Sequence, residues 1–120
     1  MKRITAEKLT EMGAYCRYVR DFRKEWPAGC MPTLRNIRRA WELELDLDWY
    51  AEQALSWDAY REFDAVRDEA SSVWNDAWNA ACDQYVEKSA HMAAMAKADE
   101  VYGLAVAKAL YHALKTGAKK

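Results

Sequence analysis

Four carboxylates alternate with apolar residues in one short stretch of this 120-residue chain, at Glu42, Glu44, Asp46 and Asp48. Closely spaced carboxylates are typical of calcium loops, but the glycine and the terminal glutamate of the helix-loop-helix pattern are missing here. Carboxylates on a protein surface can also occupy a basic groove that normally binds phosphates, through the same charge complementarity. The alternative is an ordinary solvated face. We treat the four residues as a candidate partner-binding site that mimics nucleic acid.

A second candidate site is basic and lies earlier in the chain. Its members are Arg17, Arg20, Arg23 and Lys24, together with Arg35, Arg38 and Arg39. The spacing Leu9-x3-Gly13-x5-Val19 is that of a helix-turn-helix, which would place the first group on the helix that enters a DNA groove. Nucleic-acid binding is therefore one alternative. Pairing of these side chains with acidic residues of the same chain is the other.

Tryptophan is frequent for a chain of this length. The six residues are Trp26, Trp41, Trp49, Trp57, Trp74 and Trp78. Most aromatic residues of amphipathic helices belong to the core. One small domain seldom buries six indoles, however, and exposed tryptophan beside arginine is typical of binding hot spots. We therefore add Trp74 and Trp78 to the candidate partner-binding residues.

Residues that could bind a metal or act as nucleophiles are scattered. His91 and His112 are the only histidines, and neither lies three or four residues from a cysteine or another histidine, as a zinc site requires. Cys16, Cys30 and Cys82 form no Cys-x-x-Cys pair, and nothing supplies a base and an orienting group for a thiol. We expect no catalytic residue, no metal, no cofactor, and a core position for Cys82.

Short helices are expected in the first part of the chain. Thr5 is a good N-cap for a helix that ends near Gly13. The next helix stops at Trp26, because Pro27 disfavours the α conformation in the residue before it. Thr33 then begins a helix over residues 34–43.

Residues 42–48 have a period of two, which is typical of a half-buried strand. A lone strand would leave its backbone groups unpaired. We therefore expect an extended link that ends with Asp48 as the N-cap of a helix over residues 49–55.

A long helix should begin after Ser56 and continue to about Glu87. Its apolar stripe consists of Phe63, Val66, Ala70, Val73, Ala77 and Ala81. Tyr60, Trp74, Trp78 and Tyr85 widen this stripe to an arc of roughly 140°, which two neighbouring helices could cover.

The stripe meets charges at Lys88 and Asp99, so we expect a break and a final helix that is capped by Ser89 and stopped by Gly117 as the C′ residue. The two long helices would form a hairpin, although the wide arc also admits a homodimer.

Length and composition predict a single domain over residues 1–120, with residues 118–120 as a disordered tail, and the helical periodicity makes it all-α. We expect a compact helical bundle in which two or three short N-terminal helices pack on a long C-terminal helical hairpin. Charge is divided, because residues 1–40 hold ten Lys and Arg against four Asp and Glu, whereas residues 41–100 hold four against fifteen. The N-terminus MKRITAEKL lacks an apolar run of signal-peptide length, so we expect a cytosolic chain without a membrane span.

Several segments resemble one group of proteins. They are Ile4-Thr-Ala-Glu-Lys-Leu9, Gly13-Ala14, Val19-x-x-Phe22, Trp26-Pro-Ala-Gly29, Thr33, Leu45-Asp-Leu-Asp-Trp49-x-Ala51-Glu52-x-x-Leu55-Ser56, Tyr60-Arg-Glu-Phe-Asp-Ala-Val-Arg and Ser72-Val-Trp-Asn-Asp-Ala-Trp-Asn-Ala-Ala. Over residues 4–85 the chain is similar to small accessory proteins of tailed bacteriophages and prophages. It departs from them at Trp26-Pro27, where Phe-Pro is common, and at Cys16, which is displaced by one position. Most such proteins have no assigned activity, so the resemblance implies a phage genome and no site residues.

The resulting hypothesis is a non-enzymatic, phage-encoded anti-defence protein in the cytoplasm of the bacterial host. It would bind a host nucleoprotein, with a CRISPR-Cas surveillance complex as the expected target, and block nucleic-acid access or effector recruitment. The candidate partner-binding residues are Glu42, Glu44, Asp46, Asp48, Arg35, Arg38, Arg39, Trp74 and Trp78. The alternatives are a nucleic-acid-binding regulator that uses the basic helices, and a structural or immunity-type helical oligomer.

Overall fold

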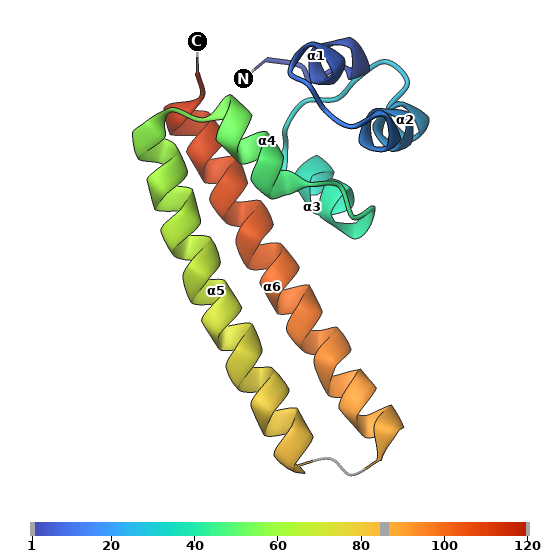
Figure 1. Ribbon diagram of the computed structural model, residues 1–120, viewed down its shortest axis with the longest axis vertical. Coiled ribbons are helices and arrows are strands. Elements are labelled where there is room, and N and C mark those ends of the chain that lie inside the picture. The colour runs from blue at the N-terminus through green and yellow to red at the C-terminus, as the bar shows by residue number, and fades with distance from the viewer. Residues whose placement is uncertain (1, 85–86, 120) are drawn as a thin grey trace.

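Six helices and no strand make up the part of the chain that the computed structural model describes, residues 2–84 and 87–119 (Figure 1). Their bounds are α1 Ala6–Glu11, α2 Cys16–Glu25, α3 Leu34–Glu42, α4 Leu47–Ala54, α5 Trp57–Gln84 and α6 Lys88–Gly117. The predicted all-α class is confirmed. Four short helices rather than two or three precede the long pair.

Local capping explains where three helices begin. The hydroxyl oxygens of Thr5 and Thr33 accept hydrogen bonds from backbone N–H groups three residues on, at 3.1 and 3.2 Å, as predicted. Ser56 accepts the same bond from Ala59 at 3.3 Å and starts α5. Trp26 is the C-cap of α2, where Pro27 prevents a further helical residue.

The link between α3 and α4 differs from the prediction. Glu44 has a left-handed backbone with φ of 61°, so the chain turns sharply instead of running extended. Asp46, not Asp48, is the N-cap of α4, because its carboxylate accepts a hydrogen bond from the backbone N–H of Trp49 at 3.0 Å. A start at this position buries Leu47 and Ala51, which are four residues apart on one face of α4.

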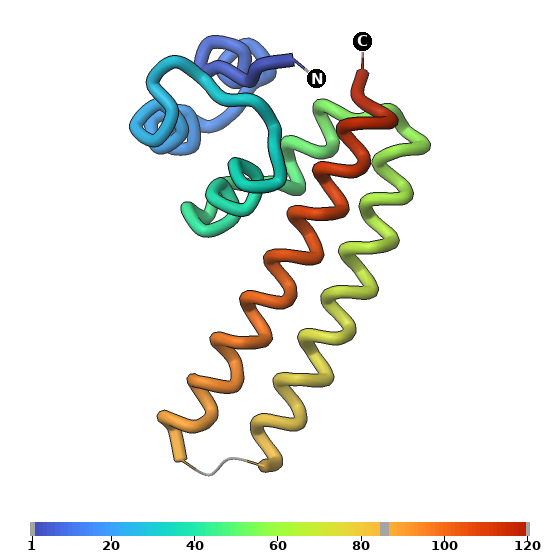
Figure 2. Tube along the Cα trace, turned by 180° about the vertical axis from the view of Figure 1, so that it is seen from behind, coloured from blue at the N-terminus to red at the C-terminus, as the bar shows by residue number. Residues whose placement is uncertain are grey.

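The two long helices lie side by side and antiparallel, as Figure 2 shows. Side-chain contacts cross between them, among them those of Trp74 with Asp99 and of Cys82 with His91. The predicted hairpin is therefore present. The predicted cap Ser89 is wrong, because α6 begins at Lys88 with Glu87 in the N-cap position. Tyr85, which we expected on the apolar arc, lies outside the described residues.

The C-terminal end of α6 is held against the start of α5. Gly117 is the last helical residue rather than a left-handed C′ residue, and its carbonyl accepts a hydrogen bond from the Ser56 backbone N–H at 2.7 Å. A Cβ at this position would overlap the side chain of Ala59, which explains the glycine. Within the segment that we expected as a tail, the Lys119 backbone N–H donates a hydrogen bond to the carbonyl of Ala54 at 2.8 Å; Lys120 lies outside the described residues.

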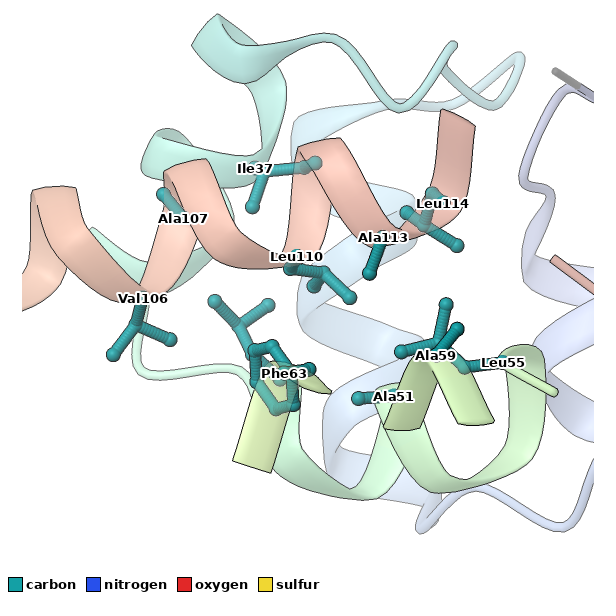
Figure 3. Packing of buried hydrophobic residues seen from close by; sticks show 11 residues of the cluster. Ile37, Ala51, Leu55, Ala59, Phe63, Val106, Ala107, Leu110, Ala113 and Leu114 are labelled. Atoms are coloured by element: carbon teal, nitrogen blue, oxygen red, sulfur yellow. The ribbon is translucent and has the colours of Figure 1, made fainter. Parts of the chain in front are cut away.

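Buried side chains form two clusters. The larger one contains residues of all four helices α3, α4, α5 and α6. Its members are Ile37, Leu47, Ala51, Leu55, Ala59, Phe63, Val106, Ala107, Leu110, Ala113 and Leu114 (Figure 3). The smaller one lies in the N-terminal lobe, by which we mean α1, α2 and the loop as far as Cys30. It consists of Ala6, Leu9, Val19, Phe22 and Cys30. Tyr50 packs against both clusters and links the lobe to the hairpin.

The far half of the hairpin extends beyond the short helices (Figure 1), so the molecule is elongated, with extents of 48 × 32 × 22 Å, rather than compact. The stripe predicted for α5 is only partly covered along the helix. Phe63 and Ala81 are buried, but Val66 and Val73 are 45% and 56% exposed. At these exposed valines α5 therefore lacks the second neighbour that the width of its arc called for.

Candidate functional site

A cleft of about 650 Å³ lies between the α3–α4 turn and the middle of the hairpin. Residues of three segments line it: Trp41, Glu42, Glu44 and Leu45 from α3 and the turn, Ser71, Trp74 and Asn75 from α5, and Asp99 and Tyr102 from α6. We call it the acidic–aromatic cleft. Three carboxylates and three aromatic rings share its walls.

The α3 side of the cleft is fixed by the packing of Trp41 on α6. The indole ring lies directly over Gly103, where a Cβ would approach ring atoms to 2.6 Å. The turn that follows is closed by hydrogen bonds from the Glu44 and Leu45 backbone N–H groups to the carbonyls of Trp41 and Ala40, both at 3.0 Å. Glu44 is therefore held beside the cleft by the backbone.

The hairpin side is organised by Trp74. Its indole N–H donates a hydrogen bond to the carboxylate of Asp99 at 2.6 Å and so links α5 to α6. The ring stacks on Trp78, with centroids 5.8 Å apart and planes inclined by 16°. Trp78 is 43% exposed and also contacts the His91 ring edge to face at 5.0 Å. The row extends the aromatic surface from the cleft toward the far end of the hairpin.

The four carboxylates of residues 42–48 do not lie together in one row. Glu42 and Glu44 line the cleft with Trp74. Asp46 caps α4, and Asp48 forms a salt bridge with Arg67 at 3.1 Å. Only the first half of the candidate acidic segment therefore faces the cleft.

Arg67 of α5 is surrounded by three carboxylates, one from α4 and two from its own helix. Its guanidinium contacts Asp48, Asp64 and Asp68, and its side chain is 20% exposed. Burial lowers the pKa of Arg67, but the hydrogen bond and charge of Asp48 and the charge of Asp64 raise that pKa more, so the net shift is upward. Arg67 holds α4 on the hairpin and stays charged.

The candidate arginines of α3 are divided between two roles. Arg39 bridges Glu25 at 3.0 Å and Glu42 at 3.5 Å, and the Glu25 hydrogen bond and charge raise the Arg39 pKa. This pairing joins α2 to α3, so intramolecular pairing accounts for this residue. Arg35 is exposed, and Arg38 lines a smaller hollow of about 260 Å³ on the other side of Trp41.

Asp99, Tyr102 and Trp41 complete the cleft, although we did not nominate them as site residues from the sequence. One signal for Asp99 was present, because it places a charge where the extended apolar stripe required an apolar residue. Trp41 was recognised only as one of six tryptophans. Its position depends on Gly103, which is distant in sequence.

Among the described residues, the histidines and cysteines do not gather into a site with the carboxylates. Within residues 2–84 and 87–119, no group of three or more His, Cys, Asp or Glu side chains is placed to hold a metal ion. Cys82 is exposed, so its predicted core position is wrong; its sulfur lies 3.5 Å from Nε2 of His91. None of the helices in the described part of the chain combines the length and apolar character that a membrane span requires.

The chemistry of the acidic–aromatic cleft suits a cation. Carboxylates accept charge-assisted hydrogen bonds from a guanidinium or an ammonium group, and indole faces attract the same groups through cation–π interactions. An arginine or lysine side chain presents both features on one group. Neither a protein-family model, nor a curated protein, nor a solved structure matches this chain.

Proposed function

We propose that the protein is a non-enzymatic inhibitor that binds arginine or lysine side chains of a partner protein in its acidic–aromatic cleft. The observation that carries this proposal is the convergence of Glu42, Glu44 and Asp99 with the indoles of Trp41 and Trp74 in one hollow. Its volume, about 650 Å³, lies within the range of about 300–1,000 Å³ that is usual for ligand sites.

The partner that fits best is a protein whose own surface binds nucleic acid. Such surfaces are rich in arginine and lysine because they neutralise phosphates. A guanidinium that stacks on an indole and also meets a carboxylate gains a cation–π contact of about 0.5–2 kcal/mol in addition to its hydrogen bonds. Occupying those side chains would exclude nucleic acid from the partner.

The resemblance to phage accessory proteins narrows this proposal. A phage protein that occupies a basic surface in the bacterial cytoplasm has an obvious target in a host defence nucleoprotein. We therefore propose a CRISPR-Cas surveillance complex as the partner and interference with nucleic-acid access as the effect. This step rests on genome context and charge complementarity, and adds nothing to the cleft chemistry itself.

The experiment measures binding of target DNA to purified surveillance complexes of several types while the protein is titrated in. The wild type should inhibit one of them at stoichiometric concentration, and Glu44→Lys should weaken inhibition about tenfold or more, because a lost charge contact becomes a repulsion. Glu52→Lys is the matched control, since Glu52 is an exposed glutamate of α4 outside the cleft. Equal effects of the two variants would contradict a role for the cleft.

A second measurement separates the cleft chemistry from the identity of the partner. Tryptophan fluorescence can follow titration with a short arginine-rich peptide and with an acidic peptide of the same length. We expect saturable binding of the basic peptide alone, with loss of the signal in Glu44→Lys. Saturable binding without any inhibited nucleoprotein would retain the cation site and reject the proposed target.

Nucleic-acid binding is a second candidate because of the solvent-facing side of α2. Arg17, Arg23 and Lys24 are exposed and make no salt bridge in the described part of the chain. Binding to a DNA duplex with an affinity that falls steeply with salt, and that is lost in Arg23→Glu, would favour this candidate. The absence of duplex binding at low salt would exclude it.

A further inference from the structure

The hairpin has an apolar groove on the side opposite the acidic–aromatic cleft. This groove has a volume of about 590 Å³, and alanines such as Ala70, Ala77 and Ala98 form much of its lining. Val66 and Val73 of α5 and Val101 of α6 rise beside them and are 45%, 56% and 56% exposed. Small residues between branched ones let another helix approach closely.

Helix geometry places the groove and the cleft on opposite faces. Val66 lines the groove and Asn75, nine residues later, lines the cleft; at 100° per residue they point in opposite directions from α5. The two hollows share Trp74 and Tyr102, which lie between them. None of the residues that line the groove belongs to α1–α4. The groove can therefore be covered while the cleft stays open.

Charges along the two edges of this face have opposite signs. The outer edge of α5 carries Glu62, Glu69 and Asp76, which repeat every seven residues and so keep to one side of the helix. The outer edge of α6 carries Lys97 and Lys108. All five are exposed, and none takes part in a salt bridge within residues 2–84 and 87–119.

The register of the hairpin shows which of these charges share a level. Trp74 contacts Asp99, Cys82 contacts His91, and Ser56 contacts Gly117, so residue numbers fall along one helix as they rise along the other. Asp76 therefore lies level with Lys97. By the same register, Lys108 lies between the levels of Glu62 and Glu69.

We propose that a second copy of this chain covers the groove, related by a two-fold axis parallel to the hairpin, to give a four-helix bundle. In this arrangement α5 of each copy lies antiparallel to α6 of the other, so the acidic edge meets the basic edge twice. Asp76 of one copy lies opposite Lys97 of the second, and Val73 lies opposite Val101. A two-fold axis perpendicular to the helices would instead set α5 of one copy against α5 of the other, so that the two acidic edges would face each other.

The dimer is independent of the proposed function, because the two cleft openings remain on the outer faces. The exposed valines become its core, and the four charged edges become its rim. In the far half of the hairpin, where α1–α4 do not line the groove, the long helices thereby obtain the second neighbour that the apolar arc of α5 needs.

The test is the mass of this 120-residue chain in solution, measured by sedimentation equilibrium over a wide range of concentration. We expect a dimer whose dissociation constant rises about tenfold or more in Lys97→Glu with Lys108→Glu, because each attraction becomes a repulsion at two symmetry-related sites. Lys8→Glu, on an exposed position of α1, is the matched control and should leave the dimer unchanged. Circular dichroism checks that every variant is folded.

A compensating variant distinguishes the two symmetries. Adding Glu69→Lys and Asp76→Lys to the lysine reversals should restore the dimer if α5 faces α6, whereas a dimer with α5 facing α5 gains nothing from it. A protein that is monomeric at every concentration overturns the proposal and leaves the groove to a helix of another protein. A dimer that tolerates all these reversals also overturns it. Glu44→Lys should leave the dimer mass in solution unchanged. A failure of the dimer proposal can therefore be told apart from a failure of the proposed cation binding in the acidic–aromatic cleft.

Discussion

The indole ring of Trp41 packs on α6 at Gly103, where a Cβ would lie 2.6 Å from two of the ring atoms. Glycine inside a helix costs about 1 kcal/mol relative to alanine. Its presence in the middle of α6 is explained by the close approach of α3. This contact sets the wall of the acidic–aromatic cleft and places Glu42, the next residue, at its edge.

Gly103→Ala should destabilise the protein although it improves helix propensity. The methyl group forces the rigid Trp41 ring to move, and overpacking of this kind costs about 1–3 kcal/mol, more than the propensity gain of about 1 kcal/mol. Urea unfolding measures the net effect. Ala96→Gly, at an exposed position of α6, measures propensity alone. A gain of stability in Gly103→Ala would contradict the described packing of Trp41 on Gly103. Retained binding of arginine-rich peptides by this variant would show that the acidic–aromatic cleft does not depend on that packing.

Phe63 and Val73 belong to the same predicted stripe but differ in burial. Phe63 is 1% exposed, so Phe63→Ala should cost about 3–5 kcal/mol. Val73 is 56% exposed, and Val73→Ala should cost less than about 1 kcal/mol. Both are best compared in the Lys97→Glu, Lys108→Glu background, in which the proposed dimer is weakened. Equal losses would mean that the far half of the hairpin is covered within one chain.

This pair of residues also shows what sequence could predict. Periodicity identifies the apolar side of α5 correctly, since it depends only on the helical repeat. It does not tell whether the neighbour that covers that side belongs to the same chain. The caps at Thr5, Thr33 and Ser56 were predictable because each hydrogen bond spans three residues. Asp48 was the predicted cap of α4, but Asp46 holds that position, because the start of the helix depends on the burial of Leu47 in the tertiary structure.

The cleft was predictable only in part. Glu42, Glu44 and Trp74 were nominated because of their residue types and spacing. Their meeting with Asp99 depends on the register of α5 against α6, and the contact with Trp41 depends on a glycine in a different helix. Pairing across the hairpin is tertiary information that a single-sequence pattern does not contain.

Tyr50 makes stability depend on pH in the alkaline range. Burial, with a smaller contribution from the charge of Cys30, raises the pKa of Tyr50 to about 12. The unfolded state ionises near pH 10, so the stabilising difference is complete below pH 10 and is lost as the pH rises to about 12. We expect Tyr50→Phe to reduce this loss by about 2 kcal/mol in urea unfolding measured across that range.

Tyr15→Phe, at a ring that is 79% exposed, is the control. Equal pH profiles for both variants would contradict the buried phenol.

Arg67 gives the last prediction, because one guanidinium holds Asp48 of α4 while it also contacts Asp64 and Asp68 of its own helix. Arg67→Met keeps the apolar stem and removes the charge, which leaves three carboxylates close together without a cation. We expect a loss of about 1–3 kcal/mol in the free energy of unfolding. Added salt should reduce this loss, because it screens the repulsion.

Arg67→Lys should recover only part of the stability, since a single ammonium cannot reproduce the planar fork that meets two carboxylates. Arg61→Met, an exposed arginine of α5 without a salt bridge among the described residues, is the matched control. If both methionine variants lose the same stability at low salt, Arg67 does not join α4 to the hairpin in the way described.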